Sequence, residues 1–337
     1  MNINQMKSAI AKFRKADLSV IKDAKLRAKA QKLQGKEKGF TLLELLVVIT
    51  LIAILATGAL VAYENVGESA EAAQAANTIG TLDRAIRTYR AVENVYPNQW
   101  DTLMDAAGDE LTFAASGMKG FLGEWDVAGS AGLDAVLVEM FEESGIEELQ
   151  EVLAAAEVDD SPTGAPNRMH NESAGLSAEV EIEDGDFPVS LAVVPSPQCT
   201  TFGAAGGYPA AAFDPTVSIS NNELQNAYGD ALEGDECHAL IALGFGGDAA
   251  ASTAFSNVAI AQSPSYIATT GDGDTAINPE IHYSRYIGLF HAGQYDDVDN
   301  EWEWNDQLRL ITIVSTDGKN IDQLVSEANQ SSAGDDD

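Results

Sequence analysis

An apolar run covers residues 40–62, and Glu44 is its one charged side chain. A helix needs about 20 residues to cross the hydrocarbon core of a bilayer, so this run is long enough to span it. A carboxylate inside such a span costs about 2.5 to 3.5 kcal/mol on insertion scales. The run therefore predicts a membrane-spanning helix in which the charge of Glu44 needs a compensating partner.

The charge on either side of the run is strongly unequal. Residues 1–39 hold 11 Lys/Arg and 3 Asp/Glu, whereas the rest of the chain holds 8 basic and 50 acidic residues, for a net charge of −34. Basic flanks stay in the cytoplasm, so this split predicts a cytoplasmic leader and an acidic bulk on the outer side. A surface this acidic repels phosphate, which argues against nucleic acid as a partner. A cleavable secretory signal fits poorly, because both the basic and the apolar regions are too long for one.

The helical pattern continues beyond the span as an amphipathic helix to about residue 92. Apolar residues recur at spacings of three or four, with charged residues largely on the other side. The segment "NVYPNQW" ends the helix, because Pro97 cannot continue its hydrogen bonds. The inward face is predicted to consist of Val66, Ala70, Ala73, Ala76, Ile79, Leu82, Ile86 and Tyr89.

The remaining chain is predicted to form an α+β head. A helical stretch is expected at residues 133–157, a linker near residues 159–175, and strands at residues 188–195, 237–245, 256–262, 282–293 and 308–318. These strands have no alternating helices, so the sequence predicts an antiparallel sheet against which the second half of the long helix packs. The expected organisation is a basic leader at 1–39, a transmembrane and assembly helix at 40–95, a head at 96–325 with a helical insert at about 105–187, and an acidic disordered tail at 326–337.

The stretch "KGFTLLELLVVITLIAILA" resembles the prepilin signature of type IV pilins and type II secretion pseudopilins. In that family a prepilin peptidase cuts after the glycine, which is Gly39 here, and methylates the new N-terminal residue, here Phe40. The resemblance implies a pilin-like fold, in which a long N-terminal helix packs on an antiparallel sheet. It also implies processing between these two residues and assembly into a filament.

The resemblance also implies a partner for Glu44. Cleavage exposes a positively charged amine on Phe40, and in a filament the Glu44 carboxylate would pair with that amine on a neighbouring subunit. Each charge is costly alone in a low-dielectric bundle, so the pair forms only in register. The alternative is a Glu44 that lies at the membrane interface and reaches water.

Two features depart from the family pattern. The leader of 39 residues is longer than usual, so either its start codon is misassigned or it is a basic amphipathic segment on the inner membrane face. The mature chain of about 298 residues is roughly twice as long as a simple major subunit. The insert accounts for that length, and its role cannot be inferred from the sequence.

Metal and disulfide candidates lie in the head. The segment "GDGDTAINPE" offers oxygen ligands suited to calcium at Asp272, Asp274, Asn278 and Glu280. Acidic runs are also expected in a chain of this charge, and the spacing is not that of an EF-hand. Outside the cytoplasm, Cys199 and Cys237 could form a disulfide or remain two unrelated buried thiols.

Nothing in the sequence predicts catalysis. The four histidines follow no zinc-ligand spacing, and no hydrolase or phosphate-loop motif occurs. The leading hypothesis is therefore a structural subunit of a type II secretion pseudopilus or a type IV pilus, with no required cofactor and calcium as the one suggested metal. Its expected partners are homologous subunits, the prepilin peptidase, membrane lipid, and an inner-membrane platform with its ATPase. The alternatives are a membrane-tethered extracytoplasmic binding domain that does not polymerise and an anchored extracellular enzyme.

Overall fold

The computed structural model of the chain describes residues 2–34, 42–104, 111, 114–127, 133–151, 167, 179–182, 190–195, 199, 208, 213, 232, 237–268, 276–296 and 298–330. The chain divides into two compact units, Met1–Tyr63 and Glu64–Asp337. Several predicted features fall partly or wholly outside the described residues. They are the Gly39–Phe40 bond, Asp272, Asp274, much of the insert and the last seven residues of the tail.

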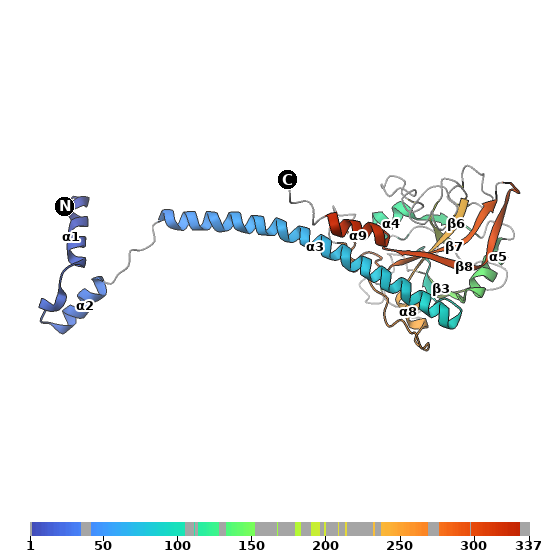
Figure 1. Cartoon of the computed structure of the whole chain (residues 1–337), viewed down its shortest axis with the longest axis horizontal. Helices are drawn as coiled ribbons and strands as arrows, with labels where there is room; N and C mark the ends of the chain where they lie inside the picture. The colour runs from blue at the N-terminus through green and yellow to red at the C-terminus, as the bar shows by residue number, and fades with distance from the viewer. Residues whose placement is uncertain are drawn as a thin grey trace. The chain divides into compact units, whose positions relative to one another are not determined.

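The first unit is helical. It contains helix α1 (Ile3–Arg14), the short 3-10 helix η1 (Leu18–Val20), helix α2 (Ala24–Gln34) and the beginning of α3 (Leu42–Glu93). Figure 1 labels the three α-helices. Asp17 and Asp23 mark the turns between the first three helices, where each carboxylate accepts the N–H of the residue two positions on. Short acidic side chains are favoured before helices for this reason.

Helix α3 is 52 residues long. It confirms the prediction of one continuous helix from about residue 40 to about residue 92. It ends where Asn94 turns into the left-handed region with φ 65°, and the N–H of this residue donates to the carbonyl of Arg90 at 2.8 Å. Asparagine adopts this conformation more readily than most residues, and Pro97 prevents a resumption of the helix.

The second unit is built on a sheet in which eight strands fall within the described residues. The path of the sheet is β2-β5-β6-β1-β3-β4, and β6 also pairs with β7, which pairs with β8. The strands are β1 (Trp100–Asp101), β2 (Gly123–Trp125), β3 (Glu148–Gln150), β4 (Glu179–Glu181), β5 (Leu191–Val193), β6 (Cys237–Gly244), β7 (Ile287–Asp296) and β8 (Glu301–Val314).

The prediction of a purely antiparallel sheet is wrong, because β1 and β3 pair in parallel. The chain between these two strands contains helix α4 (Ser116–Phe121) and helix α5 (Leu133–Glu143), and such a crossover is what returns a chain in the same direction. The predicted helical insert at 105–187 also contributes β2, β3 and β4 to the sheet. Strands of three residues are too short to show a period of two in the sequence.

The sheet has an apolar layer on each face. Ile241 and Phe290 face a layer that also holds Ile86 of α3, whereas their neighbours Leu240 and Leu289 face a second layer. Successive side chains of a strand point to opposite faces, so β6 and β7 are buried on both sides. Figure 1 shows the C-terminal half of α3 lying along the sheet.

The inward face of α3 agrees with the prediction from Ala76 onward but not at Ala70 and Ala73, and the side chain of Val66 is outside the described part of the chain. Ala76, Ile79, Leu82, Ile86 and Tyr89 are buried, whereas the two predicted alanines at 70 and 73 are exposed and those at 72 and 75 are buried instead. The stretch "SAEAAQAA" carries alanine on every side of the helix, so the apolar period could not select the inner face there.

The predicted helix at 133–157 is also too long. Helix α5 stops at Glu143, because Gly145 adopts φ 79° and the N–H of Ile146 turns back to the carbonyl of Phe141 at 3.0 Å. A Cβ atom at position 145 would lie 2.3 Å from the side chain of Val95, so only glycine fits this left-handed cap. Residues 148–150 then form β3.

Two further predictions differ from the structure. Residues 256–262 form a turn and a loop instead of a strand, because the N–H groups of Val258 and Ile260 donate to the hydroxyls of Ser256 and Thr253. The predicted tail begins five residues too early, since helix α9 (Ile321–Gln330) extends to residue 330 and buries Leu324 in the core.

Candidate functional site

The membrane-spanning candidate is the first part of α3. Residues Leu42–Leu60 have a mean hydropathy of 2.5 and are exposed along the whole window, so this one described helix is long and apolar enough to cross a membrane. Its two hydroxyls are bonded internally, since Thr50 donates to the carbonyl of Val47 at 2.9 Å and Thr57 to that of Ala53 at 2.9 Å. A lipid-facing helix requires such internal bonding, because hydrocarbon offers no partner.

Glu44 lies in the first turn of this helix and is exposed. The N-terminus of a helix carries a partial positive charge, which stabilises a carboxylate in the first turn. The apolar side chains around it are also exposed: Leu43 at 70%, Leu45 at 59% and Leu46 at 51%. Glu44 therefore lies among exposed apolar side chains at the start of the candidate span.

Comparison with protein-family models gives one match to this segment, the prokaryotic N-terminal methylation motif at residues 34–60. Residues 34–60 carry the type IV pilin and pseudopilin signal. No curated protein and no solved structure matches the chain. The match therefore identifies residues 34–60 as a pilin-type signal, and it does not extend into the acidic head.

The pilin signal contains the predicted processing residues Gly39 and Phe40, which lie outside the described residues. It also contains Glu44, whose carboxylate stands four residues after Phe40. With a single candidate span among the described helices, the signal fits a membrane-anchored protein that crosses the bilayer once.

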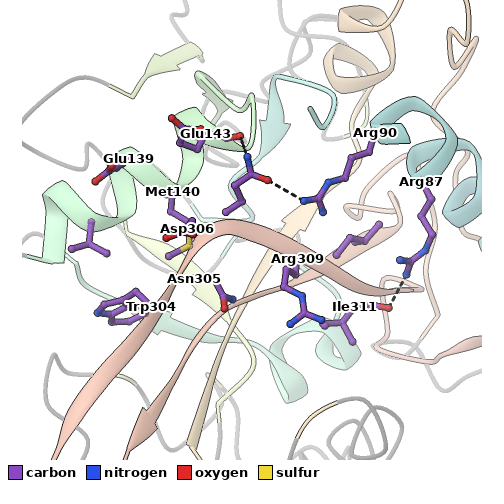
Figure 2. A pocket seen from close by; sticks show the side chains of 13 residues that line it. Arg87, Arg90, Glu139, Met140, Glu143, Trp304, Asn305, Asp306, Arg309 and Ile311 are labelled. Carbon is purple, nitrogen blue, oxygen red and sulfur yellow. Dashed lines mark hydrogen bonds between the residues drawn. The ribbon is translucent and has the colours of Figure 1, made fainter. Parts of the chain in front are cut away.

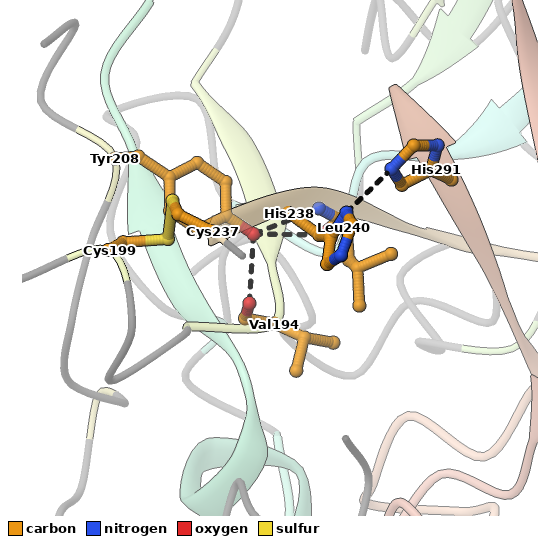
Figure 3. The surroundings of a disulfide bond; sticks show 7 residues. All are labelled: Val194, Cys199, Tyr208, Cys237, His238, Leu240 and His291. Atoms are coloured by element: carbon orange, nitrogen blue, oxygen red, sulfur yellow. Dashed lines mark hydrogen bonds between the residues drawn. A yellow bond between two sulfur atoms is a disulfide. The ribbon is translucent and has the colours of Figure 1, made fainter. Parts of the chain in front are cut away.

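In the head, Cys199 and Cys237 form a disulfide that joins residues 38 positions apart (Figure 3). Cys237 is the first residue of β6, so the bond attaches the segment around Cys199 to the central strand. Nearby, the buried hydroxyl of Tyr208 donates to the carbonyl of Val194 at 2.8 Å and accepts the N–H of Leu240 at 2.9 Å. Burial raises the pKa of Tyr208, so this hydroxyl stays protonated and holds the two backbone groups.

Beside the disulfide is a buried histidine pair that sequence reasoning did not find. Nδ1 of His238 lies 3.1 Å from Nε2 of His291, and both side chains are buried (Figure 3). The amide nitrogen of Asn305 lies 3.0 Å from Nδ1 of His291 and 3.1 Å from the carbonyl oxygen of the same residue. Because that amide can only donate, Nδ1 of His291 accepts, and its Nε2–H donates to His238. The network is satisfied when both rings are neutral.

We expect this pair to make the head less stable in mild acid. Burial, with His238 and the guanidinium of Arg309 nearby, lowers the pKa of His291 to about 4 from 6.5. Unfolded chains then bind more protons than folded ones between about pH 6.5 and 4, so stability falls as pH decreases through this window. The loss between pH 7 and pH 5 should be on the order of 1 to 2 kcal/mol.

Urea unfolding of the head at pH 7 and pH 5 measures this loss, compared between wild type, His291→Gln and His282→Gln. His282 is half-buried outside the pair, so His282→Gln should keep the wild-type pH dependence while His291→Gln reduces it. Equal pH dependence in all three proteins would show that the pair does not cause the loss.

A polar groove of about 1130 Å³ lies between α3, α5 and β8 (Figure 2). Its acidic side chains stand on α5 and β8, and its arginines stand on α3 and β8. The charged residues are Glu139, Glu143, Asp306, Arg87, Arg90 and Arg309. Burial and the neighbouring guanidinium groups of Arg309 and Arg87 lower the pKa of Arg90. The guanidinium of Arg90 lies 4.2 Å from the ring centre of Tyr96. Charges of both signs along its walls suit contact with the charged groups of another protein.

The calcium candidates are only partly described. Asn278 and Glu280 are exposed in a turn, where the side-chain oxygen of Asn278 accepts the N–H of Glu280 at 3.0 Å. The other two candidates, Asp272 and Asp274, are outside the described part of the chain, within which no three acidic, histidine or cysteine side chains group as metal ligands do. Calcium binding at this loop stays a prediction.

Proposed function

We propose that the chain is a prepilin-like structural subunit that is processed between Gly39 and Phe40 and polymerises through α3. The filament would be a type II secretion pseudopilus or a type IV pilus. The observation that carries the proposal is the pilin signal at residues 34–60, which continues into one unbroken helix of 52 residues. A structural role agrees with this signal and with the absence of a recognisable catalytic motif in the sequence.

Assembly would depend on packing of the apolar part of α3. In the membrane its side chains contact lipid, and in the filament they would contact the same helices of neighbouring subunits. Lipid chains and the side chains of neighbouring helices are similarly apolar. Replacing lipid contacts with helix contacts therefore does little to fix how the subunits align. The pair between the carboxylate of Glu44 and the new amine of Phe40 on a neighbour would supply the register.

The orientation follows from the charges on either side of the span. Basic residues before the span would keep the leader in the cytoplasm, where the prepilin peptidase and the platform with its ATPase act. The head, which carries most of the 50 acidic residues beyond residue 39, would lie in the periplasm or outside the cell. This placement suits the disulfide between Cys199 and Cys237.

Replacement of the glycine before the cleaved bond tests the proposal. In cells with prepilin peptidase and an assembly system, Gly39→Leu should accumulate as a precursor and lower the mature product by at least about tenfold, since a bulky side chain would block the scissile bond. The matched control is Gly35→Leu, the same change four residues earlier in the leader, which should be processed normally.

Immunoblots of membrane and sheared surface fractions read out both variants. Normal processing of Gly39→Leu would contradict cleavage at this bond. Normal processing of the wild type without any chain in the sheared fraction would favour the alternative, a membrane-tethered extracytoplasmic domain that does not polymerise.

A further inference from the structure

Residues 2–34, which end at the first residue of the pilin signal, form helices of their own. Helices α1 and α2 are connected through η1, and the side-chain amide of Gln34 at the end of α2 donates to the carbonyls of Phe13 and Ala16 at 2.7 and 2.8 Å. Arg27 donates from two nitrogens to the carbonyl of Ile21. These contacts hold the two helices together as a unit, which we call the leader hairpin (residues 2–34).

Large apolar side chains of the leader hairpin are exposed. On α1, Met6, Ile10 and Phe13 are 48%, 54% and 40% exposed, and their spacing of four and three places them on one face of the helix. On α2, Leu26 and Leu33 are 58% and 55% exposed at a spacing of seven. A soluble helical segment normally covers such stripes, and within the described part of this unit no core covers them.

The charges of the leader hairpin define what can cover these stripes. Residues 2–34 contain nine Lys/Arg and two acidic residues, and both acidic side chains are bonded to backbone N–H groups at helix starts. The partner must therefore be apolar and negatively charged at the same time. Nucleic acid supplies the charge without an apolar layer, whereas an anionic bilayer surface supplies both.

We propose that the leader hairpin docks on an anionic lipid surface, with the apolar stripes of α1 and α2 inserted among the acyl chains and the lysines in contact with lipid phosphates. The chain continues from this hairpin into a span, so the bilayer lies within reach of every copy that is inserted. Docking requires neither cleavage at Gly39 nor polymerisation, so its failure would leave the filament proposal intact.

The test uses the full chain in liposomes of phosphatidylcholine alone or with about 30% phosphatidylglycerol, which gives the bilayer a negative surface potential. A fluorophore that reports polarity is attached to a single new cysteine, either Ile10→Cys on the stripe or Ser8→Cys on the opposite side of α1. The native cysteines are joined to each other and do not react. Ser8 lies about 200° around the helix from Ile10, so it is a matched control.

With phosphatidylglycerol, the probe at position 10 should shift its emission to the blue. A quencher within the acyl chains should reduce its emission at least about threefold more than that of the probe at position 8. Neutralising Lys7, Lys12 and Lys15 with glutamine should weaken docking at least about tenfold, whereas arginine at the same positions should preserve it. Equal quenching of the two probes would overturn the proposal, as would equal docking on phosphatidylcholine alone. Displacement of the probe from the anionic bilayer by duplex DNA would also overturn it, because nucleic acid would then be the preferred partner.

Discussion

Replacing Glu44 with alanine is expected to lower incorporation of the chain into filaments by about a hundredfold or more. The reason is the amine that processing would leave on Phe40 of the neighbouring subunit. Removing one partner of a buried ion pair leaves the other charge uncompensated, at a cost of about 3 to 5 kcal/mol. Immunoblots of sheared surface fractions, normalised to the membrane pool, measure incorporation.

Two variants separate this effect from a general defect. Glu44→Asp retains the carboxylate on a shorter side chain and should keep part of the assembly, whereas Glu44→Gln removes the charge at nearly the same size and should behave like alanine. Processing should continue in all three, because the pair can form only after the Gly39–Phe40 bond has been cleaved. Filaments of normal abundance from Glu44→Ala would show that Glu44 does not set the register and only lies at the membrane interface.

The second large effect is expected at Trp100 in the head, where Trp100→Ala should lower the free energy of unfolding by about 3 to 5 kcal/mol. Trp100 is fully buried, and its ring packs edge-on against Phe245 and Phe290 with ring centres 5.2 and 5.1 Å away. Its indole N–H donates to the carbonyl of Pro97 at 2.6 Å. The side chain thus connects the segment that follows α3 to the centre of the sheet, and alanine would leave a cavity there.

Thermal unfolding of the chain in detergent, followed by circular dichroism, measures this loss. Trp100→Phe keeps an aromatic ring and should cost less than alanine, about 1 to 2 kcal/mol. Phe255→Ala is the surface control, because Phe255 is fully exposed and its loss should change stability by less than about 0.5 kcal/mol. A Trp100→Ala protein as stable as Phe255→Ala would contradict the described packing.

The features that the sequence predicts well are local. The pilin signal and the span are contiguous, and the amphipathic half of α3 has apolar residues such as Ile79, Leu82 and Ile86 whose polar neighbours leave one possible inner face. In the alanine-rich stretch before them, alanines stand on several sides of the helix. The sequence therefore predicts a helix in this stretch but not which side of it faces the sheet.

The features that the sequence does not predict depend on contacts between distant residues. The end of α5 depends on the left-handed Gly145 against Val95, and the parallel pairing of β1 with β3 depends on the path of the chain through α5. Similarly, His238 and His291 lie 53 positions apart, and only the register of β6 with β7 brings their rings together. A single sequence carries no signal for such pairs.

The central claim is that the chain follows the prepilin pathway, and mass spectrometry tests it most directly. The measurement is the intact mass and the N-terminal peptide of the protein from membrane fractions and from filaments sheared off the cell surface. We predict a chain that begins at Phe40 and carries one added methyl group in the sheared fraction. A chain that still begins at Met1, in cells with an active prepilin peptidase, would contradict the account.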